Sequence, residues 1–65
     1  MSNMNREEIS KVNAIWEKFD ELNEFEREFM RQMVNRTDKF GEKTQISLKQ
    51  EEVLKRISIK YLNKW

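Results

Sequence analysis

The stretch that most constrains this chain is residues 46–65, ISLKQEEVLKRISIKYLNKW, because as a helix it would be apolar over much of its circumference. Ser47, followed three residues later by Gln50, has the pattern of a capping box and predicts a helix start. One apolar face at helical spacing consists of Leu54, Ile57, Tyr61 and Trp65. Further apolar residues point away from that face, namely Leu48, Ile59 and Leu62. A helix of this kind needs cover on two sides, which the rest of the chain must supply.

Two more helices precede this stretch. Asn5 and Asn23 are each followed by a glutamate at the third position, which again predicts capping boxes. The expected helices span about residues 6–20, 23–37 and 48–63. One bent helix running through residue 20 is the alternative, because no strong breaker separates the first two. We therefore predict one domain over residues 1–65, with the all-α fold of a small three-helix bundle.

The second helix has an ambiguous face and end. Its expected apolar stripe contains Phe25, Phe29 and Met33, with Met30 and Val34 on the flank. We place its end between Asn35 and Lys39, although Gly41 suits the position beyond a helix end. The expected centre of the core is Leu54, Ile57 and Phe29.

The ends and the loop complete the architecture. Residues 1–4 are expected to fray, since nothing in the sequence fixes them. Residues 40–46 form the one substantial loop, with Phe40 and Ile46 as buried anchors beneath it.

Composition excludes several classes of site. The chain has no cysteine and no histidine, so disulfides, the usual zinc sites and the usual catalytic triads are absent. One glycine cannot build a phosphate-binding loop, which excludes an autonomous motor ATPase. No apolar run reaches the ~18–20 residues that span a bilayer, and the N-terminus lacks a secretory signal pattern. We expect a cytoplasmic, non-enzymatic protein with no cofactor, no metal and no membrane contact.

Charge is divided unevenly along the chain. Residues 1–30 contain four basic and eight acidic side chains, a net −4, whereas residues 31–65 contain nine basic and four acidic ones, a net +5. A basic half can attract nucleic acid, or the two halves can simply complement each other. The acidic residues between 20 and 28 lack calcium-loop spacing, and we expect them to be solvated.

A narrow basic ridge on the last helix is the best candidate site. It consists of Lys49, Arg56, Lys60 and Lys64. Proteins that bind single-stranded nucleic acid combine such cations with aromatic stacking platforms. Tyr61 and Trp65 lie near the end of the ridge, but both also have the spacing of core aromatics. We expect Tyr61 in the core and leave Trp65 open.

Two resemblances bear on function. Residues 47–57, SLKQEEVLKRI, resemble the start of the helix-turn-helix of sigma-type and LuxR-type regulators. Only SIKYLNKW follows, so the recognition helix of those families is missing.

The second resemblance covers residues 23–61. FEREF at 25–29, then ISLKQEEVLKRI at 46–57 and the basic Lys60, resemble a short helical module of phage and bacterial DNA-processing proteins. A chain of this size and pattern is also similar to the small accessory proteins encoded beside the UvsW recombination helicase of T-even bacteriophages. This resemblance implies a role in phage DNA replication, recombination or repair, and it assigns no individual site residue.

Two hypotheses follow. In the first, the chain is an accessory module that works beside a helicase and contacts single-stranded or branched DNA through Lys49, Arg56, Lys60, Lys64 and Trp65. In the second, it binds only protein, a helicase or a second copy, through Met30, Val34 and Trp65. An enzyme is disfavoured because nucleophiles and a phosphate loop are missing. We expect a monomer.

Overall fold

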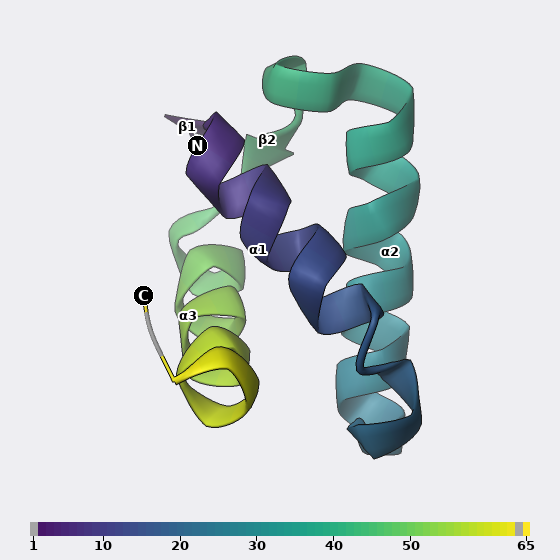
Figure 1. The fold of residues 1–65 in the computed structure, drawn as a ribbon. Helices are drawn as coiled ribbons and strands as arrows, with labels where there is room; N and C mark the ends of the chain where they lie inside the picture. Colours follow the sequence, from purple (N-terminus) through teal and green to yellow (C-terminus); the bar gives the residue numbers. More distant parts are fainter. Residues whose placement is uncertain (1, 64) are drawn as a thin grey trace.

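The structure is a computed structural model that describes residues 2–63 and 65 (Figure 1). In this part of the chain the helices are α1 (Arg6–Trp16), α2 (Glu24–Phe40) and α3 (Leu48–Leu62). Two short strands, β1 (Ser2–Asn3) and β2 (Gln45–Ile46), and two short 3₁₀ turns complete it. The predicted all-α three-helix bundle is confirmed, and the strands are an addition that the sequence did not predict.

All three helices start at the predicted capping boxes. The Asn5 and Asn23 side chains each accept a hydrogen bond from the backbone amide three residues on, at 2.8 Å. The glutamates at those positions accept from the amides of the caps at 2.9 Å. Ser47 and Gln50 form the third box at 3.1 and 3.0 Å. These bonds satisfy amides that a helix start would otherwise leave without partners.

The helix ends differ from the prediction. α1 stops at Trp16, and a 3₁₀ turn at Phe19–Glu21 separates it from α2, so the bent continuous helix is wrong. α2 continues to Phe40, beyond the predicted end, because Gly41 adopts φ +57° and terminates it there. A side chain at that φ would be strained, whereas glycine is not.

The buried face of α2 is not the predicted one. Its buried residues are Glu26, Met30, Met33 and Thr37. Phe25 is 64% exposed, and Phe29 is only half-buried. The predicted stripe was therefore wrong at its start, where Glu26 is buried in place of Phe25. The reason is that Glu26, a polar residue, is turned inward and paired there.

Residues near the N-terminus are held in place, contrary to the predicted fraying. β1 pairs antiparallel with β2, with Ser2 opposite Ile46 and Asn3 opposite Gln45. The Met4 amide donates to the Thr44 carbonyl at 2.8 Å, and the Met4 side chain is buried. The fraying prediction is wrong for residues 2–4, and residue 1 lies outside the described part.

The core lies where α1 crosses the other two helices (Figure 1). Its buried apolar residues are Met4, Val12, Ile15, Leu22, Met30, Met33, Ile46, Leu54 and Ile57. Leu54 and Ile57 confirm two of the three residues predicted for the centre, whereas the third, Phe29, is only half-buried, so that part was wrong. Ile46 confirms one of the two loop anchors. Phe40 is 54% exposed, so its prediction as an anchor was wrong. Within the described residues, no helix has both the length and the apolar character needed to cross a membrane.

Candidate nucleic-acid interface

The basic ridge is present on α3 as an exposed stripe. Lys49, Arg56 and Lys60 are exposed and recur at intervals of seven and four residues, so they lie on one side of the helix. Lys64, its fourth predicted member, lies outside the described residues.

A shallow groove of about 210 Å³ runs beside this ridge, between α3 and the first turn of α2. Its lining consists of Phe25, Glu26, Val53, Arg56, Ile57 and Lys60. The exposed Phe25 ring stacks on Phe29 at 6.5 Å between centroids. The structure therefore brings an exposed aromatic ring to two cations of the ridge. Sequence reasoning missed Phe25 because it assigned that residue to the core stripe.

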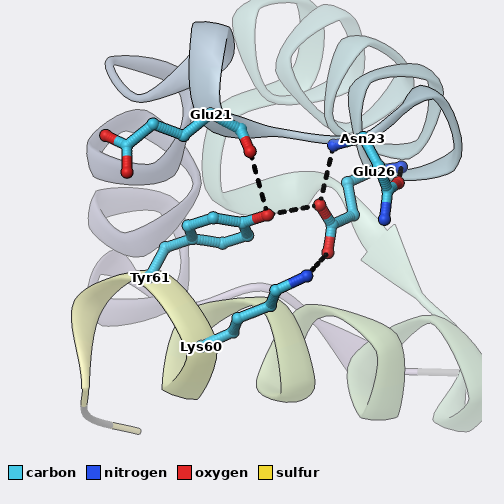
Figure 2. Close-up of polar contacts among 5 residues, drawn as sticks. All are labelled: Glu21, Asn23, Glu26, Lys60 and Tyr61. Carbon is cyan, nitrogen blue, oxygen red and sulfur yellow. Dashed lines mark hydrogen bonds and ion pairs between the residues drawn. The ribbon is translucent and has the colours of Figure 1, made fainter.

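Glu26 lines this groove and is the centre of a polar cluster (Figure 2). Its Oε1 accepts a hydrogen bond from the Tyr61 hydroxyl at 2.6 Å and from the Asn23 amide at 2.9 Å. Its Oε2 accepts from Lys60 Nζ at 3.1 Å. The Tyr61 hydroxyl also lies 3.2 Å from the Glu21 carbonyl oxygen. Two residues of α3 are thus tied to the start of α2.

The contacts of Glu26 shift the acid–base properties of all three side chains. Burial alone would raise the pKa of the Glu26 carboxyl. Hydrogen bonds from Tyr61, the Asn23 amide and Lys60 outweigh burial and hold the Glu26 pKa below its ordinary value. The hydrogen bond to Glu26 raises the pKa of Lys60 and that of Tyr61. Glu26 is therefore an ionised anchor, and the prediction that it belongs to a solvated acidic surface is wrong.

The pairing with Glu26 changes the electrostatics of the ridge. Lys60 keeps its side chain 57% exposed, but a carboxylate 3.1 Å away compensates its charge. Lys49 and Arg56 have no ion-pair partner among residues 2–63 and 65. The charge available to an anionic ligand therefore comes mainly from Lys49 and Arg56.

Trp65 does not extend the ridge. It is 40% exposed, and Lys11 Nζ of α1 lies 4.2 Å from the centre of its ring. It borders a hollow lined by Leu48 and Lys55, which lie on the side of α3 turned away from Phe25. The helix ends at Leu62, and the next residue, Asn63, takes φ +56°, which is not a helical conformation. Trp65 is therefore separate from the ridge, whereas Tyr61 is half-buried against the core, as predicted.

The predicted protein-binding strip does not form an exposed surface. Met30 is completely buried in the core, and Val34 is half-buried against it. The expectation that Met30 docks a partner is wrong, because α2 turns this residue inward together with Glu26.

Among the described residues, no group of three or more acidic side chains is placed to hold a metal ion. The one buried carboxylate, Glu26, already accepts hydrogen bonds at both of its oxygens. Besides Glu26, the groove is lined by an aromatic ring, two aliphatic side chains and two cations.

Comparisons with protein-family models, with curated proteins and with solved structures find no match for this chain.

Proposed function

We propose that this domain is a non-catalytic accessory module of phage DNA recombination, repair or replication. In this proposal it acts beside a helicase in the cytoplasm of the host and contacts single-stranded DNA through Lys49, Arg56 and Phe25. The DNA-processing context is suggested by the resemblance of residues 23–61 to phage modules. The choice of surface depends on one observation, the exposed Phe25 ring beside Arg56 in the groove.

The proposed contact follows from the side chains available. A base can stack on the open face of Phe25, since base–aromatic stacking tolerates any base. Arg56 can then bind the adjacent phosphate in a bidentate manner. Lys49, which lies about two helical turns away from Arg56, can bind a further phosphate. Lys60 contributes less, because Glu26 already accepts its hydrogen bond. Two phosphate contacts predict weak binding with a salt slope of about −1.4, at about −0.7 per phosphate.

The test uses fluorescence anisotropy of a labelled oligo-dT, titrated with the protein at several salt concentrations. Phe25→Ala should weaken binding about tenfold, within the range of one lost stacking contact. Its matched control is Phe40→Ala, because Phe40 is also exposed, at 54% against 64%, but does not line the groove.

The charge contribution has its own control. Arg56→Gln should weaken binding and make the salt slope shallower by about 0.7. Lys43→Gln removes the same charge in the 3₁₀ turn Gly41–Lys43, outside the groove, and should change neither. Equal effects of Arg56→Gln and Lys43→Gln would mean that DNA responds only to the net charge of the protein and not to this groove. No binding at about 0.5 mM protein in low salt would contradict the proposal as a whole.

Protein binding without DNA contact is the second candidate. It is favoured by Leu48, which is 83% exposed on the outer side of α3 and is the most exposed large apolar side chain described. If a helicase covers it, cross-linking of the helicase to Lys55 should be lost on Leu48→Asp. Retained cross-linking in that variant would argue against this surface.

A further inference from the structure

The outer side of α3 is an uncovered helix face with both apolar and charged side chains. Leu48, Glu52, Lys55 and Ile59 recur there at intervals of four, three and four residues, and all four are exposed. Leu48 is 83% and Ile59 is 48% exposed. The sequence predicted that a helix so apolar needs cover on two sides, but α1 and α2 leave this side open.

The order of these four residues makes the face complementary to itself. Leu48 and Ile59 are centred on a point between residues 53 and 54, and so are Glu52 and Lys55. When two copies of α3 pack antiparallel about that point, each Leu48 lies opposite Ile59 of the other copy. Each Glu52 then lies opposite Lys55 of the other copy, as a twofold axis requires. The spacing is that of the seam between paired helices.

We infer that this face, Leu48, Glu52, Lys55 and Ile59, binds a second copy of the same chain in an antiparallel, twofold-symmetric dimer. Glu52 and Lys55 have no ion-pair partner among the described residues of their own chain, so both are available for pairing across the axis. The dimer departs from the monomer expected from the sequence.

The charges also argue against other occupants. Two acidic side chains, Glu51 and Glu52, and one basic one, Lys55, line the hollow next to Leu48, so a polyanion or an anionic lipid surface would meet a net negative charge there. A partner of one charge sign would leave either Glu52 or Lys55 facing a like charge. A second copy matches both signs at once.

Trp65 lies at the edge of the proposed interface and would add buried area to it. It lines the same hollow as Leu48, Glu52 and Lys55, so an approaching α3 would cover part of its ring. The seam runs from Leu48 to Ile59, which makes it about 16 Å long. That is short compared with a standard interface of about 800 Å² per partner. The dimer should therefore be weak, with a dissociation constant on the order of 100 μM.

Sedimentation velocity from about 10 μM to 1 mM protein tests the dimer. The wild type should shift from monomer to dimer over this range. Glu52→Lys and Lys55→Glu should each weaken association at least tenfold, because each places two like-charged pairs across the axis. The double variant Glu52→Lys/Lys55→Glu restores opposite charges and should return to within about threefold of wild type.

Several outcomes would overturn the inference. A wild type that stays monomeric at 1 mM contradicts it, as does a double variant that associates no better than the single ones. Single variants that dimerise like the wild type would place the contact elsewhere. The four side chains are exposed, and circular dichroism checks that each variant is folded. Phe25→Ala serves as the control, since it alters the DNA-binding groove and should leave dimerisation unchanged, which separates this inference from the proposed function.

Discussion

The helix starts of α1 and α2 use the same local motif in two different surroundings. Asn5 with Glu8 and Asn23 with Glu26 form capping boxes with the same two distances, 2.9 and 2.8 Å. Glu8 has no other hydrogen bond among the described residues, whereas Glu26 is buried and also binds Tyr61 and Lys60. The first capping box only starts a helix. The second also connects Glu26 to Lys60 and Tyr61, which lie 34 and 35 positions farther along the chain.

This difference shows that a local sequence pattern does not reveal whether its residues also make contacts with distant parts of the chain. Four residues are enough to predict both boxes, because the bonds within them are local. The second role of Glu26 depends on where the last turn of α3 lies, which no short pattern contains. Substitutions at matched positions of the two boxes should separate the local contribution from the tertiary one.

The largest expected effect is that of truncating the two glutamates. Glu26→Ala should lower the free energy of unfolding by about 2–3 kcal/mol, because the Asn23 amide loses its acceptor and the Tyr61 hydroxyl loses the closer of its two acceptors. Glu8→Ala should cost about 0.5 kcal/mol, the cost of a local cap contact alone. Urea unfolding followed by circular dichroism measures both. Equal losses would mean that the contacts to α3 add no stability.

A smaller contrast is expected at the cap residues themselves. Asn23→Ala should cost about 1–2 kcal/mol and Asn5→Ala about 0.5–1 kcal/mol, both within the range measured for N-caps. Asn23 is the costlier because it also holds Glu26 in place for Tyr61. Thermal unfolding of the pair gives the comparison, and a larger loss at Asn5 would contradict it.

The smallest effect is a change with pH. The folded-state pKa of Glu26 is lowered, so its stabilising contribution is complete above the ordinary value of 4.5. It is lost as the pH falls through the lower folded-state pKa. The difference in unfolding free energy between wild type and Glu26→Gln should therefore be constant near pH 6–7 and shrink toward pH 3. All other carboxyls are common to both proteins. A difference in unfolding free energy that grows as the pH falls would therefore mean that folding raises the pKa of Glu26, contrary to this prediction.

Much of the fold was predictable because its determinants are local. Ser47, Asn23 and Asn5 start helices through bonds that span three residues, and the spacing of Leu54 and Ile57 marks the core side of α3. The two-residue strands were not predictable, because Ser2 and Ile46 pair across more than forty residues and carry no strand pattern.

The candidate site was predictable in its cations but not in its aromatic ring. The spacing of Lys49 and Arg56 alone places them on one face of a helix. Phe25 and Glu26 differ by one helical position, and hydrophobicity favours burying the phenylalanine. The structure buries the glutamate instead, because Tyr61 and Lys60 supply hydrogen bonds that offset its loss of water. Such an exchange depends on contacts between distant parts of the chain.

The pairing of β1 with β2 also affects how the chain can fold during synthesis. Ser2 and Asn3 leave the ribosome before their partners, Gln45 and Ile46, which follow only after both α1 and α2 have been made. The buried Met4 side chain stays without its full surroundings over the same interval, since the Thr44 carbonyl that holds its amide is also missing. A nascent chain can thus form α1 and α2 first, but it can close its hydrophobic core only once β2 and the core residues Leu54 and Ile57 of α3 have emerged.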